Sequence, residues 1–143
     1  SLSDIQFIKK LMNKISATHN DTSFIDVYSI KVTELEIKAQ SIQYTALRIL
    51  SSLKSGDSPG PESSMMKTLV TDLEQEISEV TLEIIGYYGI PFQDTNLGSN
   101  EPAIGEESFR SIAGRYQNLR ATTIYGGSNE IQRNIMAKAV LGL

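Results

Sequence analysis

The residues best placed to do chemistry lie near the end of the chain, in the stretch IYGGSNEIQRNI at positions 124–135. Two glycines, a serine and an asparagine run directly into isoleucines four residues apart, Ile131 and Ile135. This order predicts a tight turn followed by the first turn of a helix, with the serine as N-cap. A helix start presents free backbone N–H groups. The sequence therefore indicates a possible binding site at the start of this helix.

Composition excludes several other kinds of chemistry. The chain has no cysteine and a single histidine, His19, so it offers no disulfide, no thiolate and no histidine cluster for zinc or a transition metal. A formal net charge of −4 and scattered basic residues argue against nucleic-acid binding. There is no apolar run of about 18 residues and no signal peptide, so we expect a cytoplasmic protein that does not bind membranes.

The hydrophobic pattern predicts an all-α fold. A chain of 143 residues, 40% of them apolar, suits one folded domain. Apolar residues three and four apart predict helices over residues 5–15, 21–55, 61–85, 108–122 and 129–141. Residues 89–108 carry no period, and a loop of that length is usually functional or covers something.

The helix predicted over 21–55 is apolar on two sides. One row repeats every seven residues: Tyr28, Leu35, Ile42 and Ile49. A second row lies about 200° around the helix from the first: Ile30, Ile37 and Tyr44. Because a monomer tolerates so much exposed apolar surface badly, we predict self-association.

The helix predicted after Pro61 has one apolar and one acidic face. The apolar face consists of Met65, Leu69, Leu73, Ile77, Val80 and Ile84. The acidic residues are Asp72, Glu74, Glu76 and Glu79. We expect the first set to face the core and the second to be solvated.

Three segments together resemble one enzyme family. The run RYQNLRATTIYGGSNEIQRNIMAKAVLGL closely resembles the C-terminal signature of acyl-CoA dehydrogenases. The segments PGPESSMMK and EIIGYYGIP resemble two earlier segments of a bacterial-type branch of that family. The resemblance covers essentially the whole chain, and it implies that residues 1–143 are the C-terminal up-and-down helical bundle of a longer flavoenzyme, with the first bundle helix largely missing.

The resemblance also implies an activity. Acyl-CoA dehydrogenases use FAD to oxidise the α,β-bond of an acyl-CoA thioester, pass electrons to an electron-transfer flavoprotein and form homodimers or homotetramers. A carboxylate removes the α-proton, and in the commonest family pattern it is a glutamate directly after the tyrosine of the last motif. Here that position is Gly126, so the catalytic set is empty within this chain. Tyr125 and Gly126 are left as the expected substrate-facing residues.

Three sources of a base remain open. Glu130 is the nearest carboxylate, but a residue in the first helical turn points away from the turn's tip. In some branches of the family the base lies on the first helix of the bundle. The resemblance implies that this helix is largely missing from residues 1–143. A third alternative is a subunit without a base that pairs with an active one.

Flavin contacts follow from the resemblance position by position. Ser128 and Glu130 match residues that contact the cofactor at the start of the last helix. Glu83, Gly86 and Tyr87 match residues that reach the flavin of a neighbouring subunit, although the family often has glutamine where Glu83 stands. The structural alternatives are an ordinary N-cap in the first segment and a glycine-terminated helix in the second.

Two arginines stand outside the expected site. Arg120 and Arg133 could pair with phosphates or carboxylates, but in a helical bundle such residues more often form structural ion pairs. A helical oligomerisation module without catalysis is the remaining alternative function. Such a module does not require a glycine-rich turn before its last helix, so the motif favours the flavoenzyme.

Overall fold

The computed structural model describes residues 2–19, 23–54, 60–93 and 102–142. These residues form α1 (Leu2–His19), α2 (Ser23–Lys54), α3 (Glu62–Ile85), α4 (Ile112–Leu119) and α5 (Asn129–Leu141). Short 3-10 helices occur at η1 (Gly86–Gly89), η2 (Glu107–Phe109) and η3 (Arg120–Thr123). The described part of the chain contains no strand, so the all-α prediction is confirmed.

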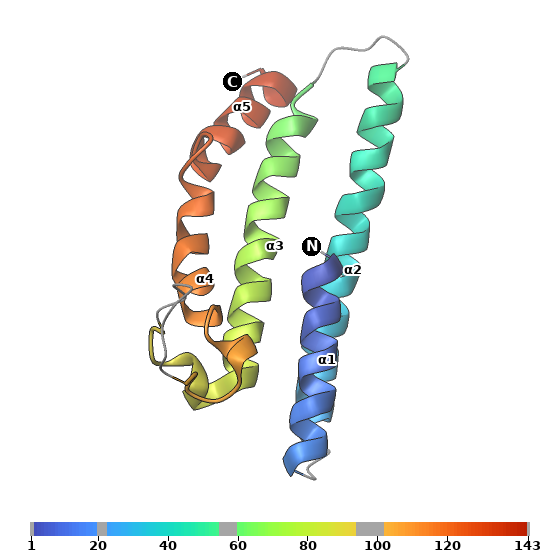
Figure 1. The fold of residues 1–143 in the computed structure, drawn as a ribbon. Coiled ribbons are helices and arrows are strands. Elements are labelled where there is room, and N and C mark those ends of the chain that lie inside the picture. The colour runs from blue at the N-terminus through green and yellow to red at the C-terminus, as the bar shows by residue number, and fades with distance from the viewer. Residues whose placement is uncertain (1, 20–22, 55–59, 94–101, 143) are drawn as a thin grey trace.

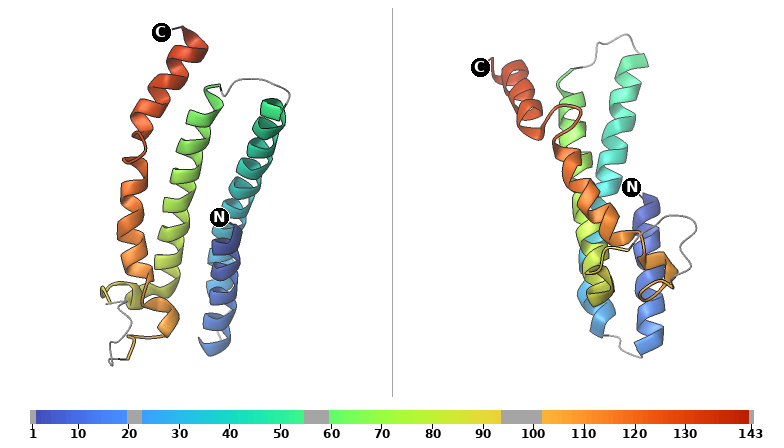
Figure 2. Two further views of the ribbon diagram at one scale, coloured as in Figure 1. Left: turned by 45° about the horizontal axis from the view of Figure 1, so that its top comes forward. Right: turned by 60° about the vertical axis from the view of Figure 1, so that its left-hand side comes forward.

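The helices run up and down beside one another (Figure 1). α2 runs opposite to α1, α3 runs opposite to α2, and α4 and α5 together form the last column, which runs opposite to α3. α3 is central, because it contacts α1 and α2 as well as α4 and α5. Figure 2 shows the α4–α5 column bending where α5 begins. This bend is the glycine-rich turn that the sequence singled out.

The core lies where α1 covers the first half of α2 and the second half of α3. The buried hydrophobic residues of these three helices are Ile5, Ile8, Leu11, Met12, Val32, Leu35, Ala39, Leu73, Ile77, Val80, Ile84 and Ile85. α1 is too short to reach the second half of α2 (Figure 1). Leu47 and Leu50 consequently remain 56% and 55% exposed.

Two features of α3 differ from the prediction. Leu69 is 42% exposed rather than part of the core, because it lies on the part of α3 beyond the end of α1. A second face is buried and carries small polar residues: Ser64, Thr68, Thr71, Ser78 and Thr81. The hydroxyl groups of Thr68, Thr71, Ser78 and Thr81 each donate to a backbone carbonyl of the same helix, and these small side chains leave room for α4 and α5 to approach.

The acidic residues of α3 are not simply solvated. Glu76 pairs with Lys38 of α2, and Glu79 lies 2.6 Å from Arg120 at the end of α4. Hydrophobic periodicity places such carboxylates outside the core but does not identify the neighbouring helix that supplies their partners.

The predicted connections are described in part. Residues 94–101 of the predicted loop and residues 55–59 before α3 lie outside the described residues. The amide of Gln93 closes the described ends of the loop, since it accepts a hydrogen bond from the Ile104 N–H at 2.8 Å and donates to the Ile104 carbonyl at 3.2 Å. None of the described helices has the length and apolar character needed to cross a membrane.

Candidate flavin-binding turn

The turn before α5 is built on two glycines with left-handed backbone. Gly126 has φ of 68° and Gly127 has φ of 87°, a region that side chains with a Cβ rarely adopt. A Cβ at Gly126 would meet no atom within 4 Å, whereas one at Gly127 would lie 2.7 Å from Nε2 of Gln132. The space beside Gly126 is therefore open.

Ser128 is the N-cap that the sequence predicted. Its backbone is extended (φ −62°, ψ 156°) and its hydroxyl oxygen accepts a hydrogen bond from the Ile131 N–H at 3.5 Å. The bond is long, so much of the positive end of α5 remains available to other acceptors.

Glu130 supplies one such acceptor. Its carboxylate is exposed, and hydrogen bonds from its own backbone N–H and from the Ser128 hydroxyl lower its pKa. The nearby charges of Arg133 and Lys67 act in the same direction. A general base works best with a pKa near the operating pH, so this environment makes Glu130 a poor base and a good acceptor for hydroxyl groups.

Asn129 fixes the turn to the bundle, a role that its sequence context does not reveal. Its side chain is buried, with 3% of the residue exposed. The Oδ1 atom accepts from Lys67 at 2.8 Å and from Thr71 at 3.2 Å, and Nδ2 donates to Asp72 at 2.9 Å. All three partners lie on α3. From the sequence, an asparagine at the start of a helix suggests only a helix cap. Its partners on α3 cannot be predicted from local sequence, because they are about sixty residues away.

The second predicted segment lies at the other end of α3. Gly86 ends the helix with φ of 57°, and Tyr87 after it is 89% exposed. Glu83 pairs with Lys31 of α2 at 2.6 Å, and this contact raises the pKa of Lys31. A cleft of about 410 Å³ opens here between the end of α3 and α4, lined in part by Glu83 and Gly86.

The two predicted segments do not come together within one chain. Asn129 docks at Thr71, and fifteen residues of α3 separate Thr71 from Gly86. At 1.5 Å per residue that distance is about 22 Å. The ribbon places η1 and the start of α5 at different levels of the bundle (Figure 1).

Tyr125 and Gly126, the predicted substrate-facing residues, sit at the tip of the turn. Tyr125 is 59% exposed, and Ile124 before it is 69% exposed. Both aromatic and aliphatic side chains therefore face outward next to the open space at Gly126. No cluster of metal-ligating side chains is found among the described residues.

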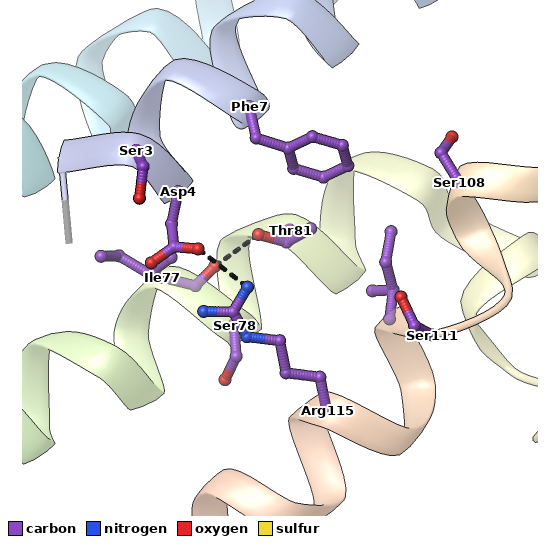
Figure 3. A pocket seen from close by; sticks show the side chains of 10 residues that line it. Ser3, Asp4, Phe7, Ile77, Ser78, Thr81, Ser108, Ser111 and Arg115 are labelled. Atoms are coloured by element: carbon purple, nitrogen blue, oxygen red, sulfur yellow. Dashed lines mark hydrogen bonds and ion pairs between the residues drawn. The ribbon is translucent and has the colours of Figure 1, made fainter. Parts of the chain in front are cut away.

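Another cavity contains none of the predicted site residues. It has a volume of about 400 Å³ and lies between α1, α3 and α4 (Figure 3). Asp4 and Arg115 point toward each other across it, 2.8 Å apart. Burial raises the pKa of Asp4, but the positive charges around it, led by Arg115, outweigh burial and bring that pKa to about 2. The pair ties α1 to α4.

Arg120 and Arg133 both lie within ion-pair distance of acidic residues of α3. Arg120 reaches from the end of α4 to the Gln75 carbonyl at 3.2 Å and the Ser78 hydroxyl at 3.0 Å. Its guanidinium also lies 4.5 Å from the centre of the Tyr116 ring. Arg133 lies 3.8 Å from Asp72.

Comparison with known proteins identifies a family for this chain. Residues 23–141 match the family described as acyl-CoA dehydrogenase, C-terminal domain. Acyl-CoA dehydrogenase IpdE1 of Mycobacterium tuberculosis is 35% identical over 106 residues, which cover 70% of this chain and 24% of that protein. The protein of the same name from Mycolicibacterium smegmatis is 37% identical over 87 residues, covering 61% of this chain and 19% of that protein.

The chain thus spans about a quarter or less of the relatives that it matches. No solved structure matches it.

Proposed function

This chain belongs to the acyl-CoA dehydrogenase family, and from that membership we propose that it is the C-terminal helical domain of a longer, FAD-dependent enzyme that oxidises an acyl-CoA thioester. Within that enzyme it contributes cofactor-binding and subunit-contact surface. The observation that carries the proposal is the turn before α5. Here the space beside Gly126 is empty, and the first N–H groups of α5 have a single side-chain acceptor, Ser128.

The residues of the turn suit the sugar part of FAD better than its phosphates. The Ser128 hydroxyl and the Glu130 carboxylate are hydrogen-bond acceptors at the positive end of a helix, and a carboxylate attracts hydroxyl groups and repels phosphate. Ser128 and Glu130 would therefore hold the ribose or ribityl hydroxyls. Bound flavin would supply the acceptor for the hydride that leaves the β-carbon of the substrate.

The separation along α3 supports a composite site. Tyr87 and Gly86 lie about 22 Å from the turn, so one copy does not present both segments to the same part of a ligand. We propose that Glu83, Gly86 and Tyr87 serve the flavin of a neighbouring subunit. Glu83 is the weakest member of this set, because its carboxylate is already paired with Lys31.

The proton-abstracting base comes from outside the turn in this proposal. Gly126 has no side chain, and the lowered pKa of Glu130 weakens it as a base. In this proposal Tyr125 and Gly126 supply no base and border the space beside the thioester. A subunit that has no base and pairs with an active one is the second candidate, and the same two observations favour it.

The test uses the complete polypeptide encoded by the gene, mixed without oxygen with acyl-CoAs of several chain lengths. Bleaching of the flavin absorbance band by one of them is expected. Gly126→Ala should still bleach within tenfold of the wild type, since loss of a general base costs on the order of 10²–10⁴ in rate. Glu130→Gln, which keeps the size of the side chain, should also bleach.

The outcomes separate the candidates. If Glu130→Gln abolishes bleaching while flavin stays bound, Glu130 is the base and the assignment is wrong. If the wild type holds flavin but no acyl-CoA bleaches it, the subunit without a base becomes the better explanation. A complete polypeptide that holds no flavin would leave only the non-catalytic helical module.

A further inference from the structure

Both ends of the glycine-rich turn are attached to the same part of α3. At the entrance, Nε2 of Gln75 donates to the carbonyl oxygens of Leu119 and Arg120 at 3.1 and 3.4 Å. At the exit, the Asn129 amide donates to Asp72 at 2.9 Å. Asp72 and Gln75 are three residues apart, so they are neighbours on one face of α3. The chain therefore leaves one helical turn of α3 and comes back to it.

The turn segment, which comprises residues 120–128, is attached at its two ends and weakly held at its tip. Near the entrance Thr122 is buried, and its hydroxyl donates to the Leu119 carbonyl at 2.8 Å. At the tip, the Gly126 carbonyl accepts from the Gln132 amide at 3.5 Å, which is long for a hydrogen bond. The two attachments to α3 therefore determine where the tip lies.

The entrance is held by a reciprocal contact between Gln75 and Arg120. The side-chain amide of Gln75 donates to the Arg120 carbonyl, and the Arg120 guanidinium donates to the Gln75 carbonyl at 3.2 Å. The same guanidinium also donates to the Ser78 hydroxyl at 3.0 Å. Because each side chain binds the backbone of the other residue, the end of α4 keeps its register against α3.

The exit is held by an amide that the neighbouring charges allow in one orientation. The Asn129 oxygen accepts from the Lys67 ammonium at 2.8 Å, and its nitrogen donates to the Asp72 carboxylate at 2.9 Å. A flipped amide would set its N–H groups against the ammonium and its oxygen against the carboxylate, which is unfavourable on both sides. Asn129 is the first residue of α5, so this single orientation fixes the first turn of that helix against α3.

We propose that Gln75 and Asn129 are positioning residues for the cofactor, which hold the turn segment in its binding geometry before FAD arrives. The inference rests on the proposed function, in which Ser128 and Glu130 contact FAD. A site that is already ordered loses less conformational entropy when its ligand binds. Loosening either attachment should therefore weaken FAD binding, although the groups proposed to touch FAD are all still present.

The entrance is tested with Gln75→Met in the complete polypeptide, because methionine keeps the length of the side chain but donates no hydrogen bond. In the cofactor-free protein, amide hydrogen exchange of the turn segment, followed by mass spectrometry, should become faster. The dissociation constant for FAD, measured by titration of flavin fluorescence, should rise on the order of tenfold, which is what one ordinary hydrogen bond contributes.

The exit is tested by exchanging its donor and acceptor. Asn129→Asp removes the N–H donor and sets a second carboxylate against Asp72, so it should accelerate exchange and weaken FAD binding. Adding Asp72→Asn puts the donor on α3 and the acceptor on α5, across the same contact. This double variant should return both measurements to near the wild-type values.

Val32→Ala is the control for a loss of stability alone. Val32 is 2% exposed and packs in the core on α2, which carries none of the contacts described for the turn segment. The substitution leaves a cavity and destabilises the fold. Exchange of the turn segment and the dissociation constant for FAD should nevertheless stay within about twofold of the wild type, because the turn segment opens locally.

Four results would count against these roles. Equal weakening of FAD binding by Val32→Ala and Gln75→Met would overturn the inference, because lost stability would explain both. A double variant as weak as Asn129→Asp would overturn the role of the exit contact. Faster exchange with an unchanged affinity for FAD would overturn this inference and leave the proposed function in place. A wild-type polypeptide that binds no FAD would overturn the proposed function as well.

Discussion

The side-chain amide of Asn129 donates a hydrogen bond of 2.9 Å to Asp72 and so joins the start of α5 to the middle of α3. Lys67 and Thr71 complete the contact from the same helix. The glycine-rich turn is held in place by this one buried residue directly after Ser128. The stability of the bundle and the geometry of the turn are therefore linked.

Replacing Asn129 should destabilise the fold. Asn129→Ala removes a buried amide and leaves the Asp72 and Lys67 side chains short of a partner, which we expect to cost about 2 kcal/mol of unfolding free energy. Denaturant titration followed by circular dichroism measures this. Asn134→Ala on the exposed side of α5 is the matched control and should change stability by less than about 0.5 kcal/mol. Equal midpoints for the two variants would contradict the role given to Asn129.

Arginine should be required at position 120. Its guanidinium contacts Gln75, Ser78, Glu79 and the Tyr116 ring together, and a lysine ammonium cannot reproduce that geometry. Arg120→Lys should lower the unfolding free energy by about 1 kcal/mol. Arg133→Lys keeps the charge at an exposed position 3.8 Å from Asp72 and should have almost no effect. If both variants unfold alike, the Arg120 contacts contribute nothing specific.

Acid should weaken the contact between α1 and α4. The pKa of Asp4 is about 2 in the folded protein, against an ordinary value of about 3.9 in an unfolded chain. Because folding lowers this pKa, the stabilisation is complete above about pH 4 and is lost as the pH falls toward 2. Arg115 is half exposed, so solvent screening limits the effect to about 1 kcal/mol.

The pH prediction is checked with Asp4→Asn. The difference in unfolding free energy between wild type and this variant should be constant from pH 5 to 7, as expected for an acid that titrates near pH 2–4, and should shrink below about pH 4. Glu34→Gln, at an exposed acid on α2 that takes no part in the Asp4 contact, is the control. A difference that does not change with pH would show that Asp4 acts through packing alone.

Residues 1–143 by themselves should retain no FAD. The two proposed contact segments lie about 22 Å apart on one chain, and a few polar groups at the start of α5 do not offset the cost of ordering so large a ligand. The purified chain, incubated with FAD and passed through gel filtration, should elute without flavin absorbance. Flavin that co-elutes one to one would refute this.

The sequence was sufficient for the helices and for the turn. Unbroken three- and four-residue periodicity predicted α2 and α3 to within a few residues, because that pattern follows from helical geometry alone. Ser128 as N-cap followed equally from local chemistry, since a serine before a helix accepts from the backbone of the next turn. Family membership was also predicted correctly from the last motif.

The tertiary structure decided which groups meet. Leu69 has the helical spacing of a core residue but is exposed, because the length and position of α1 determine how far the core extends. Asn129, Arg120 and Asp4 acquire their roles from partners between 41 and 111 residues away, and no local pattern records such contacts. The same holds for the distance between Ser128 and Tyr87. Local sequence sets the conformation of each segment, whereas the packing of α3 against its neighbours sets which segments share a site.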